Sequence, residues 1–285
     1  MKNILKELRI HHYTKNLLVF VALACSGCFF DIYKLIPGIW SFLAFCMISS
    51  SIYIFNDIHD VEKDRNHPTK RQRPIASGAI SLKKGWTMFF VLICLAVAFN
   101  CMAYSLLSSV LLLLYFTLNI AYSLGLKDIP ILDVTILVSG FLIRVLYGAV
   151  MTQIEVSNWL YLTVIASAFY FALGKRRNEL KRVETGVTRK VLSFYTEGFL
   201  DKNMYMCLGL ANTFYALWAM DKGSAGGYSK YLIWTVPIVF LIFMKYSLNI
   251  EGNSDGDPVE VLVHDKILIA LCVIYGLAMC GIIYL

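Results

Sequence analysis

Four polar side chains in the stretch NDIHDVEKD share one face if the segment is helical. They are Asn56, Asp57, Asp60 and Asp64. At about 100° per residue they fall within an arc of roughly 100°, where carboxylates repel one another unless a cation lies between them. Hard oxygen ligands at this spacing suit Mg²⁺, which also binds substrate phosphates. The sequence therefore predicts that all four bind Mg²⁺ and that the three aspartates act in catalysis.

A basic loop follows the acidic face directly. Pro68 is expected to end the helix near His67, and the chain continues through Lys70, Arg71 and Arg73 into the turn PIASG. Cations on a returning loop would bind the phosphates that Mg²⁺ neutralises. Acids for a metal, joined to bases for phosphate, predict a site for a Mg²⁺-diphosphate. The alternative is a solvated helix end followed by basic residues that anchor the protein at a membrane.

The elements that position these residues are expected to be membrane helices. The 285 residues are 58% hydrophobic and 16% charged, and their mean hydropathy is +0.65. A membrane-spanning helix needs about 20 mostly apolar residues. The fold class predicted is an all-α integral membrane protein, with residues 1–285 forming a single polytopic domain. Its nine transmembrane helices are expected at 16–33, 37–55, 86–104, 106–124, 131–151, 157–174, 203–221, 230–248 and 266–285.

Positive charges predict the orientation in the cell membrane. With nine helices, the amino-terminal arm shares a side with alternate loops, and this side collects most of the basic residues. The opposite side has only Lys34, Lys222 and Lys230. We therefore expect the amino terminus and the acidic site in the cytoplasm and the carboxyl terminus outside. The net charge of +7 reflects this bias, so no nucleic-acid partner is expected.

The acidic stretch has the pattern N-D-x-x-D-x-x-x-D and resembles the first aspartate-rich motif of the UbiA superfamily of intramembrane prenyltransferases. The resemblance implies nine transmembrane helices with a polar cap on the cytoplasmic side. Further segments, spread from Tyr13 to Leu268, look like the decaprenyl-phosphate phosphoribosyltransferase branch. They are HHYTKNLLVF, DRNHPTKRQRPIASG, LDVTILVSGFLIRVLYGA, FALGKRRNEL and GDPVEVLVHDKIL.

The branch implies Mg²⁺-dependent transfer of 5-phosphoribosyl from phosphoribosyl diphosphate to a polyprenyl phosphate, with release of diphosphate, in cell wall biogenesis. Mg²⁺ would neutralise the leaving group, and exclusion of water would protect the ribosyl centre from hydrolysis. The alternative is a Mg²⁺-dependent prenyltransferase that moves a prenyl group from prenyl diphosphate to an aromatic or other small acceptor. A transporter is disfavoured because transporters place ionisable residues near the membrane midplane, whereas these acids are expected in cytoplasmic loops.

A second cluster lies in the segment GKRRNEL, where the aromatic prenyltransferases of the superfamily carry another D-x-x-x-D motif. The basic sequence that replaces this motif favours a donor with an additional phosphate. The candidate residues for binding this donor are Lys175, Arg176 and Glu179. Plain anchoring by positive charges is the alternative. Whether this second site uses Glu179, Asp201 or Asp265 stays open.

Arg144 lies about midway into an apolar segment, where a charge is costly and usually faces a cavity or an acid. We expect it to act in catalysis or to pair with Asp133, eleven residues earlier on the same helix face. Asp133 is itself a candidate ligand for the metal or the ribose.

The remaining substrate-binding candidates are less specific. Tyr122 and Lys127 occupy a loop in which the superfamily has a Tyr–Lys pair, although their spacing is one residue longer. Lys15 would either reach a phosphate or anchor the first span. Tyr53 precedes the acids by one turn and is a possible hydrogen-bond donor. Asp265, in the last cytoplasmic loop, is not explained by helix capping.

Overall fold

The computed structural model describes residues 2–103, 105–181, 190–224, 227–251 and 258–284, and within them it contains helices and no strand. The chain divides into two compact units, each described here by itself. Unit 1 comprises Met1–Leu126 and Ile143–Glu155, and unit 2 comprises Lys127–Leu142 and Val156–Leu285. Helix α7 (Leu132–Thr152) contributes residues to both units.

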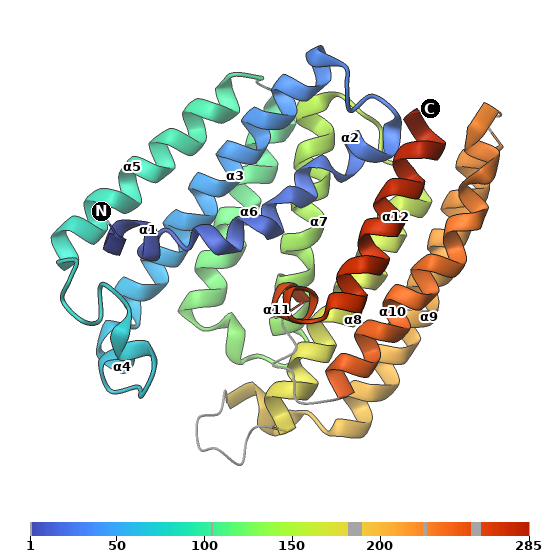
Figure 1. Ribbon diagram of the computed structural model, residues 1–285. Coiled ribbons are helices and arrows are strands. Elements are labelled where there is room, and N and C mark those ends of the chain that lie inside the picture. Colours follow the sequence, from blue (N-terminus) through green and yellow to red (C-terminus); the bar gives the residue numbers. More distant parts are fainter. Residues whose placement is uncertain (1, 104, 182–189, 225–226, 252–257, 285) are drawn as a thin grey trace. The chain divides into compact units, whose positions relative to one another are not determined.

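Unit 1 is built around the long helix α3. Figure 1 shows α5 and α6 beside it, and both helices pack against α3. Its described elements are α1 (Lys2–Glu7), η1 (Ile10–Phe20), α2 (Val21–Ser26), α3 (Ile32–His59), α4 (Val61–Arg65), η2 (Lys70–Gln72), α5 (Leu82–Cys101) and α6 (Leu106–Leu124). Aromatic side chains fill its core, where Phe45 of α3 lies 4.6 Å from Tyr115 and 5.2 Å from Tyr147, centroid to centroid.

Unit 2 is a bundle in which α8 packs against α9. Its described elements are α8 (Asn158–Lys181), η5 (Lys190–Phe194), α9 (Glu197–Gly223), η6 (Gly227–Thr235), α10 (Val236–Glu251), α11 (Pro258–His264) and α12 (Lys266–Tyr284), after η3 (Leu126–Asp128) and the first part of α7. Thr196 begins α9 by accepting a hydrogen bond from the Phe199 amide, which satisfies one of the free N–H groups of the first turn.

Six helical segments of the described chain are long and apolar enough to span a membrane. They are Ile32–His59, Leu82–Cys101, Leu106–Leu124, Leu132–Thr152, Lys230–Glu251 and Lys266–Tyr284. The spans expected at 157–174 and 203–221 are helical, within α8 and α9, but polar residues such as Tyr161 and Asn212 dilute their apolar character. The span expected at 16–33 is divided, because α2 ends at Ser26 and the next residue, Gly27, has φ +83°. All-helical structure is confirmed, and nine spans remain a prediction.

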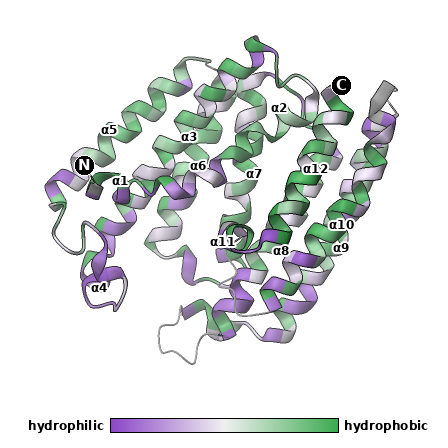
Figure 2. Cartoon of the chain, in the orientation of Figure 1, coloured by the Kyte–Doolittle hydropathy of each residue, from purple (hydrophilic) through white to green (hydrophobic). Residues whose placement is uncertain are grey.

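Polar residues in unit 1 are concentrated at one end of α3. Figure 2 shows hydrophilic residues gathered over α4 and the loop that follows it, whereas α5 is hydrophobic along most of its length. The acidic stretch and the basic loop therefore fold together as one polar region, beside helices whose outer surfaces are apolar.

Gly148 marks the closest approach of two backbones in unit 1. A Cβ atom at this position would lie 1.8 Å from the carbonyl oxygen of Val19 in η1, so only glycine fits between the segments. One turn earlier on α7, Arg144 Nε donates to Asn16 Oδ1 of η1 at 3.0 Å. Gly148 thus allows η1 to pack close enough to α7 for Asn16 to bind Arg144.

We predict that Gly148→Ala lowers the stability of the detergent-purified protein by about 1–3 kcal/mol, because the neighbouring atom belongs to a backbone that cannot simply rotate away. Thermal unfolding followed by intrinsic fluorescence measures the change. Gly209→Ala is the control, since a Cβ at Gly209 meets nothing within 4 Å. Equal melting temperatures for Gly148→Ala and the wild type would contradict the close approach.

Candidate active site

The acidic residues lie where α3 passes into α4. The helix predicted through all of them is interrupted at Asp60, which joins α3 to α4 with φ −93° and ψ 12°. Helical hydrogen bonding nevertheless continues across the junction, from Asp60 N to Asn56 O at 2.9 Å and from Asp64 N to Asp60 O at 2.8 Å. The turn spacing that brings the acids together is therefore retained despite the interruption.

Arg73 joins two of these acids. Its Nη1 donates to Asp57 Oδ1 at 3.0 Å and to Asp64 Oδ2 at 2.6 Å. Both carboxylates are buried, with 2% and 3% of their surface exposed, so the contacts are charge-assisted bonds shielded from water. The predicted return of the basic loop over the acidic face is confirmed for Arg73.

A second arginine reaches the same carboxylate from the amino-terminal arm, the segment formed by α1 and residues 8–9. Arg9 Nη2 donates to Asp57 Oδ1 at 2.6 Å, and its guanidinium lies 4.7 Å from the centre of the Tyr53 ring. Arg9 was not predicted as a site residue, because in the sequence it stands only as one of the positive charges that orient the protein. Tyr53, predicted to bind substrate, lines the site through this contact.

Glu7 is a buried acid that the sequence analysis also missed. It is 1% exposed, and neither carboxyl oxygen has a hydrogen-bond partner among the described residues. Burial first, and then the negative charge of Asp57, raise the pKa of Glu7 to about 7, although Arg9 and Arg73 oppose the shift. Asn56 Oδ1 is likewise buried without a hydrogen-bond partner in the described part of the chain.

These oxygen atoms fit a hard divalent cation that the substrate helps to bind. Asp60 lies 3.4 Å from His59 Nδ1 and 3.6 Å from Lys63 Nζ. Among the described residues, no three His, Cys, Asp or Glu side chains form a ready-made metal cage. Mg²⁺ is usually held by one or two carboxylates, waters and substrate phosphates rather than by such a cage. Asn56 and the three aspartates are the residues that would hold it.

Unit 2 contains its own buried ion pair. Arg176 Nε donates to Asp133 Oδ2 at 2.6 Å and Arg176 Nη1 to Glu179 Oε2 at 2.7 Å, while the side chains of Asp133 and Arg176 are 0% exposed. Tyr195 donates to Asp133 Oδ1 at 2.6 Å. Burial and this hydrogen bond raise the pKa of Tyr195 to about 12. The arrangement joins α7, α8 and the segment after η5, and substrate binding by its members remains a prediction.

The expected pairing of Arg144 with Asp133 is wrong. Arg144 is 7% exposed, and its Nε donates to Asn16 Oδ1 and its Nη2 to Tyr115 Oη at 2.7 Å. Its guanidinium also lies 5.3 Å from the centre of the Phe45 ring. Eleven residues of helix advance about 16 Å, which is farther than an arginine side chain reaches.

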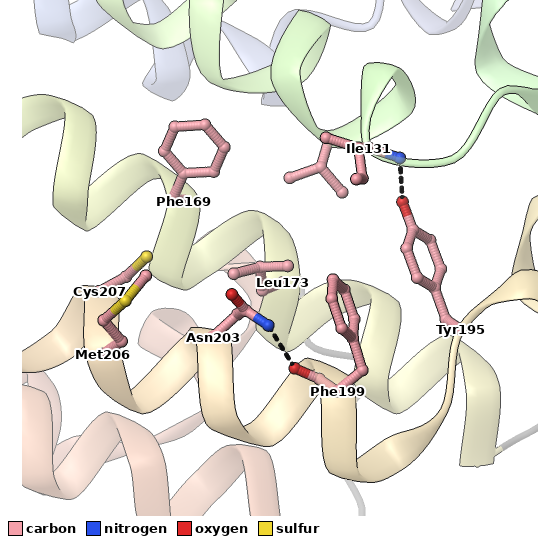
Figure 3. A pocket seen from close by; sticks show the side chains of 9 residues that line it. Ile131, Phe169, Leu173, Tyr195, Phe199, Asn203, Met206 and Cys207 are labelled. Carbon is pink, nitrogen blue, oxygen red and sulfur yellow. Dashed lines mark hydrogen bonds between the residues drawn. The ribbon is translucent and has the colours of Figure 1, made fainter.

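An apolar pocket of about 250 Å³ lies beside the ion pair in unit 2. Figure 3 shows Phe169 and Leu173 of α8 facing it, with Phe199, Asn203, Met206 and Cys207 of α9 on the opposite side. Tyr195 closes one end, where its hydroxyl accepts a hydrogen bond from Ile131 N at 2.6 Å. The pocket can take an apolar group, and Tyr195 links its wall to Asp133.

Asp265 has a structural environment. It lies 2.8 Å from Lys245 Nζ and accepts a hydrogen bond from Leu268 N at 2.9 Å, which caps α12. The Lys245 contact and this backbone bond hold the pKa of Asp265 below its usual range. Helix capping therefore gives Asp265 a structural role, and its role in substrate binding is still a prediction.

The other predicted residues are placed on different elements, and their roles remain predictions. Lys70 and Arg71 lie in η2 with exposed side chains. Lys15 lies in η1, Tyr122 in α6, Lys127 in η3 and Lys175 in α8.

Comparison with known proteins identifies the family of this chain. A family model described as "UbiA prenyltransferase family" matches residues 17–258. The chain belongs to the UbiA prenyltransferase family. A UbiA homolog from Archaeoglobus fulgidus bound to GPP and Mg²⁺ has the same fold, with a TM-score of 0.68 and 19% identity, over 98% of this chain and 99% of that one.

Similar members of the UbiA family include two proteins named decaprenyl-phosphate phosphoribosyltransferase. The protein from Mycolicibacterium smegmatis is 34% identical over 284 residues, which cover 94% of this chain and 88% of that protein. The protein from Corynebacterium glutamicum is 32% identical over 288 residues, which cover 99% of this chain and 86% of that protein. The similarity therefore extends along nearly the whole of each chain.

We predict that Asp133→Ala destabilises the protein by about 3–5 kcal/mol, because it leaves the Arg176 guanidinium buried without its main counter-charge. The readout is the melting temperature together with the fraction that elutes as a monodisperse peak in detergent. Asp128→Ala removes a nearby exposed acid and is expected to melt like the wild type. A melting temperature of Asp133→Ala equal to that of the wild type would show that the Asp133–Arg176 ion pair contributes little to stability.

Proposed function

We propose that this protein transfers a 5-phosphoribosyl group from phosphoribosyl diphosphate to a polyprenyl phosphate and releases diphosphate, in a Mg²⁺-dependent reaction. The observation that carries the proposal is the 32–34% identity to decaprenyl-phosphate phosphoribosyltransferases over at least 94% of this chain. The protein is thus a membrane transferase, and the phosphate oxygen of the lipid is the nucleophile at the anomeric carbon.

The acidic and basic groups of unit 1 support a diphosphate site. Mg²⁺, when bound, supplies positive charge to the diphosphate leaving group. Asp57 and Asp64 are buried carboxylates that a cation could bind, and Arg9 and Arg73 donate hydrogen bonds to them. The two guanidinium groups are also the donors best suited to phosphate oxygens, since each presents several N–H groups in one plane. Donor binding would redistribute these contacts between acids, cation and phosphates.

The membrane arrangement forms part of the proposal. Nine spans in a single domain would place the amino terminus and the polar region around α4 in the cytoplasm and the carboxyl terminus outside, as the basic residues indicate. A water-soluble sugar phosphate would then reach the site from the cytoplasm, while the polyprenyl phosphate arrives from the bilayer. Such a boundary suits a reaction whose two substrates differ so strongly in polarity.

A prenyltransferase with an aromatic or other small acceptor is the second candidate. It is favoured by the fold, because structures of the Archaeoglobus fulgidus homolog are described as bound to GPP or DMAPP with Mg²⁺. The segment GKRRNEL disfavours this second candidate. The aromatic prenyltransferases of the superfamily have a second pair of aspartates at this position, whereas this chain has a basic sequence.

A transfer assay separates the two candidates. Membranes containing the protein would receive labelled phosphoribosyl diphosphate and a polyprenyl phosphate, with and without Mg²⁺. We expect label to enter the lipid phase only when Mg²⁺ is present. Absence of transfer, together with activity on a prenyl diphosphate and an aromatic acid, would replace the proposed function with the second candidate.

Asp57→Asn is expected to lower the transfer rate by about 100-fold or more while the protein still inserts into the membrane, because the variant removes the charge that binds both the cation and the arginines. Asp60→Asn is expected to act in the same direction. Initial rates at saturating substrate, normalised to purified protein, give the comparison. Asp221→Asn, at an exposed position in α9, is the matched control. Wild-type rates in both site variants would remove the metal assignment.

A further inference from the structure

The amino-terminal arm is fastened beside the acidic site on both sides of Glu7. Lys6 Nζ donates to the carbonyl oxygen of Gln72 at 3.2 Å, which ties α1 to the basic loop. Ser50 Oγ of α3 donates to the carbonyl oxygen of Leu8 at 2.8 Å. These contacts, together with the bond from Arg9 to Asp57, fix the position of the residue between them.

The backbone of the arm turns sharply after Glu7. Arg9 has φ +51° and ψ +48°, a left-handed conformation that side chains with a Cβ rarely adopt. Strain of this kind persists only where surrounding contacts impose it, and it is frequent at functional sites. The turn has a clear geometric result here, because it directs two charged side chains of the arm, Glu7 and Arg9, toward the same carboxylate of Asp57.

The carboxyl group of Glu7 is buried against a second carboxyl group, that of Asp57, and a proton shared between the two is one way to relieve their repulsion. It is 1% exposed and lies against Asp57, yet none of the described residues donates a hydrogen bond to either of its oxygens. Arg9 donates a hydrogen bond to Asp57, and Arg73 donates to Asp57 and Asp64. A buried carboxylate without a partner is strongly unfavourable. The two carboxyl groups therefore need either a proton or a metal cation between them.

We propose that Glu7 is a further ligand of the divalent cation that accompanies the diphosphate, acting together with Asp57. The proposal rests on the function proposed above. Two carboxylates plus phosphate oxygens and waters are a normal coordination set for Mg²⁺, and the unpartnered Oδ1 of Asn56 is a third protein oxygen in the same region. Cation binding would then hold the amino-terminal arm over the donor.

Metal affinity tests the proposal without depending on catalysis. Mn²⁺, a paramagnetic substitute for Mg²⁺, would be titrated into the purified full-length protein and the unbound ion measured by electron paramagnetic resonance. Glu7→Gln keeps the shape of the side chain and removes its charge, so we expect Mn²⁺ to bind about tenfold more weakly or worse. The Mg²⁺ concentration that gives half-maximal transfer should rise in parallel, and high Mg²⁺ should restore part of the rate.

Glu62→Gln is the matched control, because Glu62 is an exposed acid of α4 in the same sequence motif. It is expected to bind Mn²⁺ like the wild type. Unchanged Mn²⁺ affinity in Glu7→Gln would overturn the proposal and would mean that a proton, rather than a cation, neutralises the two carboxyl groups. If Glu7→Gln fails to fold, Glu7→Asp replaces it, since the shorter side chain draws the carboxylate back, and unchanged affinity there is equally decisive.

Failure of this proposal is distinguishable from failure of the proposed function. Suppose that the wild type transfers no phosphoribosyl group, but Glu7→Gln weakens Mn²⁺ binding. Glu7 is then a metal ligand, and the proposed reaction is wrong. Suppose instead that the wild type transfers the group and that the wild type and Glu7→Gln bind Mn²⁺ with equal affinity. The proposed reaction then stands, and Glu7 is not a metal ligand.

Discussion

The buried carboxylate of Asp57 is the interaction on which the polar end of unit 1 depends. It accepts hydrogen bonds from Arg9 and Arg73, which come from opposite directions in the sequence and from separate segments. A carboxylate with 2% exposure is tolerable only when such donors replace its lost hydration. One charge thereby organises the amino-terminal arm, the end of α3 and the basic loop into a single site.

Two buried arginines of the described chain have different surroundings. Arg176 in unit 2 is paired with the carboxylates of Asp133 and Glu179, whereas Arg144 in unit 1 donates to an amide oxygen and a phenol and lies over the Phe45 ring. In the ion pair, mutual attraction offsets the cost of desolvation. The hydrogen bonds and the ring contact of Arg144 replace part of its lost hydration.

The parts of the site that are local in sequence were predictable. The acids repeat at helical spacing, and Arg73 follows Asp57 by only 16 residues, so its return was foreseen from the basic loop. Arg9 lies 48 residues from its partner, and no periodicity links the two positions. Asp133 and Arg144 share a helix face, which made them appear paired, but rise along the helix separates residues that periodicity superimposes. All-helical structure followed from the apolar runs, whereas polar residues in α8 and α9 and a left-handed glycine after α2 leave the spans expected there as predictions.

The length of α3 has a consequence for access to the site. Its 28 residues extend about 42 Å at 1.5 Å per residue, whereas the hydrocarbon layer of a bilayer is about 30 Å thick. The helix is therefore about 12 Å longer than the hydrocarbon layer is thick. Asp57 lies in the last turn of α3, and Asp60 and Asp64 follow that turn. In an upright helix centred on the bilayer, these carboxylates would lie beyond the hydrocarbon, where water and ions reach them.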